Sequence, residues 1–230
     1  VARNITQQEA KLNTTQPDAV YVPSIAKDLV EQISFEARES EFIDAKSGVS
    51  ARMSITAYEN LISTAERRAL LAGSDQTVVR LSDFMGIIPA ITGKVELVYE
   101  GEQEGAAVVA QHLITDSIRT FFPAFFPKIE KLERDADASP YAKVLEWFFA
   151  ETGFELLDDA PDEVYQKQLD KIQPLEDLIQ RYQPSFPVQD KYFLKELILW
   201  GLVEYNKLSK ERLTEGFQFK DLYSSFITKL

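Results

Sequence analysis

Apolar residues recur at helical spacing along most of this chain. The longest stretch predicts a helix that begins near Arg52, runs to about Leu71 and stops at Gly73, a residue type that commonly ends helices. Its apolar positions are Met53, Ile55, Tyr58, Leu61, Ile62, Ala65 and Ala69. A second helix is predicted over residues 24–40, with Pro23 near its start. These two segments are the strongest structural signals in the sequence.

Further helices are predicted from the same spacing, at about 5–13, 83–91, 105–122, 140–152, 161–182, 187–208 and 218–228. Pro89 and Pro174 should bend or break the helices that contain them. Residues 94–99 alternate Val95, Leu97 and Tyr99 with their neighbours, which predicts one short strand. The expected fold is therefore mainly α, with at most one short β element.

The helical segments group into two expected subdomains. The boundary falls where "FFPAFFPKIEKLERDADASP" passes from aromatic and proline-rich to charged sequence. We expect a helical domain over residues 1–122, a linker over 123–138 and a C-terminal helical subdomain over 139–230.

Composition narrows the class of protein. Of 230 residues, 45% are hydrophobic, which is enough for one large core or two small ones. The net charge of −12 and the dispersed basic residues disfavour nucleic-acid binding, which needs a basic surface. The absence of cysteine removes disulfides and thiolate chemistry and fits a cytoplasmic setting. No signal peptide or membrane-spanning run is apparent, and the start at Val1, inside a helical pattern, suggests that a longer chain was cut.

The sequence contains few residues that could form a metal site or an acid–base catalytic site. His112 is the only histidine, which excludes sites that need two, and a lone histidine is usually a structural or surface residue. Glu96, Glu100, Glu102 and Glu104 could hold Mg²⁺ or Ca²⁺, but their spacing does not match an EF-hand. A solvated acidic turn is the favoured interpretation, and a metal-dependent enzyme is a remote one.

Two further motifs are weaker than they look. Gly93-Lys94 resembles the end of a phosphate-binding Walker A loop, but Ile88 and Val95 occupy positions where the motif needs Gly and Ser or Thr. The clusters "RTFFPAFFP" and "EWFFAETGF" could form a partner groove, although core packing is favoured. Phe125 and Phe126 are the expected exceptions because prolines flank them.

Arg52 raises a separate question, because the first turn of a helix favours anions and disfavours cations. Ser50 is the expected N-cap residue. Either Asp44 or Glu41 pairs with Arg52, or the helix start and Arg52 share an anion. From the charges alone, the local ion pair is the commoner arrangement.

The stretch "GVSARMSITAYENLISTAERRALLAGSDQTVVRLSDF" resembles the lid region of AAA+ ATPases of the magnesium-chelatase ATPase subunit and MoxR-like group. In that family a Gly-x-Ser-x-Arg signature opens a lid helix, and Gly48, Ser50 and Arg52 match it in order. The family often has Pro where this chain has Ala51, and both suit a first helical position. The match is clear over residues 47–84 and extends over about 1–122.

The resemblance implies that Arg52 is a sensor 2 arginine, which reaches the terminal phosphates of ATP with Mg²⁺, and that Ser50 and Gly48 belong to the same nucleotide-binding site. Those phosphates would be held by an AAA+ core domain upstream in the parent chain or in an adjacent subunit of a homo-oligomeric ring. This chain has neither a Walker A nor a Walker B motif, so no activity is expected from it alone. The resemblance implies ATP hydrolysis by the full-length parent and movement coupled to an unidentified protein client.

A different class of function remains open. The chain could be a helical protein–protein interaction module that keeps the lid only as a scaffold and has no nucleotide role. A Walker A and Walker B pair upstream of Val1 would favour the ATPase. No residue in this chain points to a porphyrin, and nothing in residues 139–230 resembles a known site.

Overall fold

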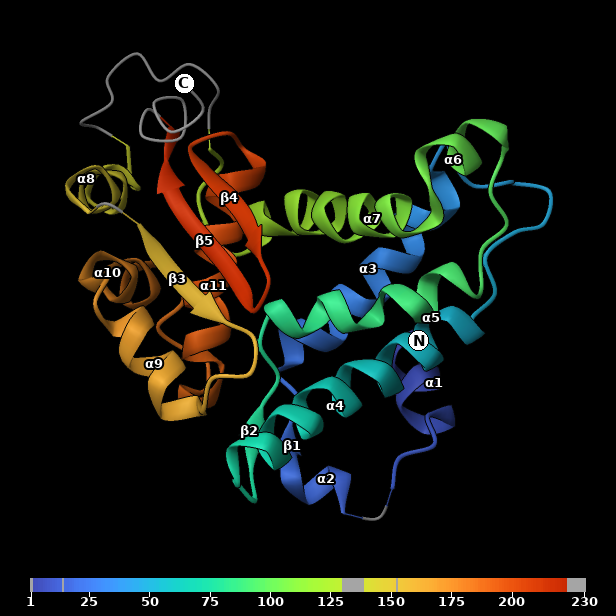
Figure 1. The fold of residues 1–230 in the computed structure, drawn as a ribbon, viewed down its shortest axis with the longest axis horizontal. Coiled ribbons are helices and arrows are strands. Elements are labelled where there is room, and N and C mark those ends of the chain that lie inside the picture. Colours follow the sequence, from blue (N-terminus) through green and yellow to red (C-terminus); the bar gives the residue numbers. More distant parts are fainter. Residues whose placement is uncertain (1, 14, 130–138, 152, 223–230) are drawn as a thin grey trace. The chain divides into compact units, whose positions relative to one another are not determined.

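The computed structural model describes residues 2–13, 15–129, 139–151 and 153–222. The described residues are mainly helical, which confirms the expected fold class. The chain forms two compact units, Val1–Phe121 (unit 1) and Phe122–Leu230 (unit 2) (Figure 1). No helix in the described ranges has both the length and the apolar character needed to cross a lipid bilayer.

Unit 1 is a helical bundle with one small sheet (Figure 1). Its elements are α1 (Ala2–Glu9), α2 (Gln16–Ala19), β1 (Val20–Tyr21), α3 (Ser24–Glu39), α4 (Arg52–Ala72), β2 (Thr77–Val78), the 3₁₀ helix η1 (Ser82–Ile87), α5 (Ile88–Thr92), α6 (Tyr99–Glu104) and α7 (Ala106–Phe121). Helix α3 packs against α4 and α7, and α5 packs against the same two helices. The core of unit 1 lies between these four helices.

Helix α4 follows the predicted pattern closely. Its buried stripe repeats every four residues, and Met53, Ala57, Leu61 and Ala65 are each at most 1% exposed. The helix ends where Gly73 adopts a left-handed conformation, with φ of 67°. Glycine adopts this conformation without a Cβ clash, which is why the sequence located the end correctly.

Two local predictions in unit 1 are wrong. Residues 94–99 form no regular strand; they make one isolated antiparallel bridge, Ile43 with Leu97, and α6 already begins at Tyr99. Pro89 does not bend a helix, because the chain is a 3₁₀ helix before it and Pro89 lies in the first turn of α5, where a missing N–H has no cost.

Unit 2 combines helices with a three-stranded sheet. Its elements are η2 (Phe122–Ala124), α8 (Ala142–Ala150), β3 (Phe154–Leu157), α9 (Asp162–Asp170), α10 (Gln173–Tyr182), η4 (Val188–Asp190), α11 (Lys191–Glu204), β4 (Leu208–Leu213) and β5 (Gly216–Asp221). Helix α11 is the centre of this unit, because its residues 193–202 are all buried. It packs against α9, α10 and β4.

The sheet of unit 2 overturns the expectation of at most one short β element. Its strands run antiparallel in the order β3-β5-β4 (Figure 1). The helix predicted over 218–228 is wrong over residues 218–221, which belong to β5. The alternation of Phe217 and Phe219 with polar neighbours was the strand signal there. Residues 223–228 lie outside the described ranges.

The aromatic exceptions are also different from those expected. Phe126 is buried at 3% exposure, beside the fully buried Phe122, whose ring centroid lies 5.5 Å away. Phe125 is half-buried against Phe186. Among the described residues of the two aromatic clusters, the strongly exposed one is Phe149, at 74% exposure on α8. Of the expected linker, residues 130–138 lie outside the described ranges.

Candidate functional site

The turn that precedes α4 is closed by Asp44. Its Oδ1 accepts the backbone N–H of Lys46 at 2.9 Å, its Oδ2 accepts the Ser47 hydroxyl at 3.2 Å, and its carbonyl oxygen accepts the Gly48 N–H at 3.3 Å. Gly48 has φ of 69°, a conformation that L side chains rarely adopt. Gly48 is therefore required by the turn, whatever the role of Arg52.

Ser50 is not the N-cap residue, as predicted, but lies one position before it and still binds the first amides of the helix. The N-cap position is Ala51, while the Ser50 hydroxyl accepts the Arg52 N–H at 3.2 Å and the Ser50 carbonyl accepts the Met53 N–H at 2.9 Å. These two amide groups are thus already engaged. An anion at this end of α4 would be bound mainly by the Arg52 guanidinium rather than by these backbone amides.

Arg52 is exposed at the first position of α4. Among the residues that the structure describes, its side chain makes no hydrogen bond and no ion pair. Neither Asp44 nor Glu41 pairs with it, and both carboxylate oxygens of Asp44 already accept hydrogen bonds within the turn. The local ion pair that the sequence favoured is absent, so the cation stands uncompensated at the positive end of a helix.

Near the opposite end of α4, a second arginine is buried and paired with a carboxylate. Arg68 is 2% exposed and pairs with Asp83, which is 5% exposed, at 2.9 Å between Nη2 and Oδ2. It also donates to the Thr77 hydroxyl at 2.7 Å and to the Val78 carbonyl at 3.0 Å. This clamp ties α4 to β2 and η1. The sequence contains a signal for this clamp: Arg68 lies three residues after Ala65, on the apolar face of the predicted helix, whereas Arg67 lies off that face. The position of Asp83 as its partner is decided by the tertiary structure.

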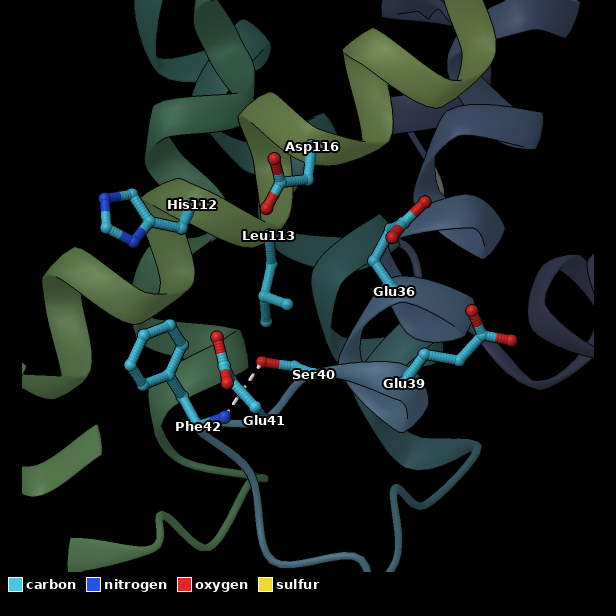
Figure 2. A pocket seen from close by; sticks show the side chains of 8 residues that line it. All are labelled: Glu36, Glu39, Ser40, Glu41, Phe42, His112, Leu113 and Asp116. Carbon is cyan, nitrogen blue, oxygen red and sulfur yellow. Dashed lines mark hydrogen bonds between the residues drawn. The ribbon is translucent and has the colours of Figure 1, made fainter. Parts of the chain in front are cut away.

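The lone histidine lines an acidic pocket of about 350 Å³ in unit 1 (Figure 2). The pocket is bounded by Glu36, Glu39, Ser40, Glu41, Phe42, His112, Leu113 and Asp116. Figure 2 shows its four carboxylates spread around the opening rather than converging on one point. No set of three or more potential ligands among the described residues is arranged to hold a metal ion, and this includes the glutamates near Gly101.

His112 itself is exposed on α7, with its ring centroid 6.5 Å from that of Phe42. The structure therefore places it at the surface, as a lone histidine usually is. The pocket brings it near carboxylates but does not show a proton-transfer pair.

Unit 2 contains buried charged side chains. Lys195 is 1% exposed and its Nζ lies 2.6 Å from Asp170 Oδ1 and 3.1 Å from Glu176 Oε2. Although burial alone would raise the pKa of Asp170, hydrogen bonds from Lys195 and Tyr192 and the nearby ammonium groups lower it. These charges are satisfied by one another and join α9, α10 and α11, which is a structural role.

A second lysine of unit 2 packs on an aromatic face. The Nζ of Lys210, on β4, lies 3.2 Å from the centroid of the Trp200 ring. Burial lowers the pKa of Lys210 to about 8, although Glu204 and Glu196 act in the opposite direction. The amine of Lys210 is thus held between α11 and β4, on the face of the Trp200 ring.

Comparisons of the chain with protein-family models, curated proteins and solved structures give no match. The functional argument therefore depends on the geometry of this chain's own residues.

Proposed function

We propose that this chain is the lid and C-terminal helical portion of a magnesium-chelatase-like AAA+ ATPase, in which Arg52 is the sensor 2 arginine. The observation that carries the proposal is the exposed guanidinium of Arg52 at the start of α4, which has no partner in the part of the chain that the structure describes. Its place in the ordered Gly48, Ser50, Arg52 signature supports the same role.

The energetics favour an external anion. A cation at a helix N-terminus is unfavourable by roughly 0.3–1 kcal/mol, and within the described residues nothing offsets it for Arg52. Hydrogen bonds between charged partners contribute roughly 1.5–3 kcal/mol each, so contact with phosphate oxygens would outweigh the unfavourable placement. A guanidinium also presents several donors in a plane, which suits a phosphate group.

Burial of the residues next to Arg52 holds the start of α4 in place, which supports this role. Met53 and Ser54 are both buried. The Ser54 hydroxyl hydrogen-bonds with the Ser34 hydroxyl at 2.5 Å and donates to the Glu31 carboxylate at 3.3 Å. Arg52 thus projects from a helix whose first turn is anchored to α3. Any movement of the phosphate relative to this helix would be transmitted to the whole of unit 1.

The rest of the proposed nucleotide site belongs to the parent chain. An AAA+ core domain upstream would hold ATP with Mg²⁺, and subunits would assemble into a homo-oligomeric, cytoplasmic ring. Residues 1–230 would then couple ATP binding and hydrolysis in the parent to conformational change, subunit contacts and a protein client. Taken alone, the chain would not hydrolyse ATP.

The test is Arg52→Ala in the full-length parent. Loss of the phosphate contact should slow ATP hydrolysis about 10- to 100-fold, because each 1.4 kcal/mol lost from the transition state is a factor of ten. Arg52→Lys should restore only part of the rate, since an ammonium group cannot reproduce the planar fork. Arg67→Ala is the matched control: it removes an exposed arginine from the other end of the same helix.

Melting temperatures complete the test. Arg52→Ala should melt within about 1–2 °C of wild type, because an exposed side chain with no partner among residues 2–13, 15–129, 139–151 and 153–222 contributes little to folding. Unchanged turnover in Arg52→Ala would remove the phosphate role. The helical interaction module without a nucleotide role would then be the better description of the chain.

A further inference from the structure

The turn of residues 42–47, which leads to Arg52 at the start of α4, is hydrogen-bonded to the segment 96–101, more than forty positions later in the chain. Ile43 and Leu97 form the antiparallel bridge, and two backbone hydrogen bonds flank it. The Asp44 N–H donates to the Glu96 carbonyl at 2.8 Å, and the Val98 N–H donates to the Phe42 carbonyl at 3.1 Å. Ile43 is also 4% exposed, so the bridge is anchored in the core of unit 1.

A side-chain contact reinforces the same junction. The Ser47 hydroxyl donates to a carboxylate oxygen of Glu96, as well as to Asp44 Oδ2 at 3.2 Å. Ser47 directly precedes the left-handed Gly48. Ser47 is therefore held both by Asp44 of its own turn and by Glu96 of the distant segment.

Gly101 makes this junction possible. A Cβ at Gly101 would lie 2.5 Å from the Phe42 carbonyl oxygen, which is the acceptor of the Val98 N–H. Its backbone does not have a positive φ, so α6 could accommodate alanine, which is a better helix former than glycine. The approach of α6 to Phe42 is thus the feature that requires glycine at position 101.

We infer that Gly101, Glu96 and Ser47 are positioning residues for Arg52, through the junction between the 42–47 turn and the 96–101 segment. The inference rests on the proposed function, because it assigns these residues to the orientation of the phosphate-contacting guanidinium. They act through the turn and do not themselves contact nucleotide. Helix α6 leads into α7, which packs against α3 and α5, so the same junction also ties the turn to the core helices of unit 1.

Two variants of the full-length parent perturb the junction to different degrees. Gly101→Ala forces α6 away from the Phe42 carbonyl, and Ser47→Ala removes only one hydroxyl. Because misplacing a contact group by about 1 Å can lower a rate about 100-fold, Gly101→Ala should slow hydrolysis about tenfold. Ser47→Ala should cause a smaller loss, and Ser47→Thr, which keeps the hydroxyl, should retain the wild-type rate.

The matched control is Gly93→Ala. Gly93 is exposed just before the same segment, and a Cβ there would approach only the Pro89 carbonyl, at 3.2 Å. This variant should leave hydrolysis unchanged.

A double-mutant cycle separates positioning from general damage to the fold. If Gly101 acts through Arg52, Gly101→Ala should have no further effect on hydrolysis in the Arg52→Ala background. Multiplicative losses would show that Gly101 acts independently of Arg52, and they would overturn the inference while the proposed function stands.

Hydrogen exchange provides a readout that does not depend on activity. Gly101→Ala should raise amide exchange in residues 42–52 by about tenfold or more, whereas Gly93→Ala should not. Unchanged exchange in both Gly101→Ala and Ser47→Ala would overturn the positioning role. If Arg52→Ala leaves turnover unchanged, the proposed function fails, and the exchange result alone decides whether the junction holds the turn.

Discussion

Removing the guanidinium of Arg68 should strongly destabilise unit 1. In Arg68→Met the side chain keeps much of its length, but the buried Asp83 carboxylate loses its counter-ion. The Thr77 hydroxyl and the Val78 carbonyl each lose a donor as well. Breaking one partner of a buried ion pair costs about 3–5 kcal/mol, because the remaining charge stays buried. That is a large fraction of the stability of an ordinary domain, about 5–15 kcal/mol.

Urea unfolding followed by circular dichroism measures this effect. With a slope of about 2 kcal/mol per molar urea, a loss of 3–5 kcal/mol lowers the midpoint by about 1.5–2.5 M. Both tryptophans, Trp147 and Trp200, belong to unit 2, so their fluorescence reports on that unit separately. Arg67→Met, on the exposed neighbour, is the control and should shift the midpoint very little.

Asp83→Asn tests the same pair from the other side. It should also destabilise, and the double variant Arg68→Met/Asp83→Asn should lose less stability than the two single losses added together. A loss of 1 kcal/mol or less in Arg68→Met would be the value expected of a solvent-exposed pair. It would refute the argument that this clamp is buried and holds α4 to β2.

Two further predictions concern unit 2. Because burial lowers the pKa of Lys210 to about 8, below its usual value of about 10.4, the folded state binds fewer protons than the unfolded state between these pH values. The difference in free energy of unfolding between wild type and Lys210→Met should therefore rise from pH 7.5 to 9.5. A fall would mean that attraction of the ammonium to the Trp200 ring outweighs burial. A parent chain truncated after Phe121 should stay monodisperse in light scattering, whereas truncation after residue 138 should aggregate, because Phe122 and Phe126 would lose their buried partners. Equal behaviour of the two truncations would contradict this assignment of the aromatic residues to the core of unit 2.

Local pattern was sufficient for the long helices. The bounds of α3 and α4 differ from the predicted ones by a residue or so, and Gly73 ends α4 as expected. Helical hydrogen bonds join residues four positions apart, and the apolar stripe repeats within a few residues, so a short window contains the relevant information. The exceptional position of Arg52 at a helix start was visible for the same reason.

Pairing between distant segments was not visible. Strand β5 pairs with its hairpin neighbour β4 and also with the distant β3, where Glu155 lies opposite Gln218. The isolated bridge of Ile43 with Leu97 likewise joins separate parts of unit 1, and a strand signal at 94–99 could not reveal its partner or its length. Such contacts depend on which segments the fold brings together, which periodicity does not encode.

By itself, the sequence determined the mainly helical class, the position of α4 and the presence of an arginine at a helix start, where a cation is unfavourable. Tertiary structure decided which charges are compensated: Arg68 is buried against Asp83, Lys195 is buried against Asp170, and Arg52 is left exposed and unpaired among the described residues. All three are cations on predicted helices. Their different environments follow from packing, because the energy of a charge depends on its solvent exposure and on partners that lie far away along the chain.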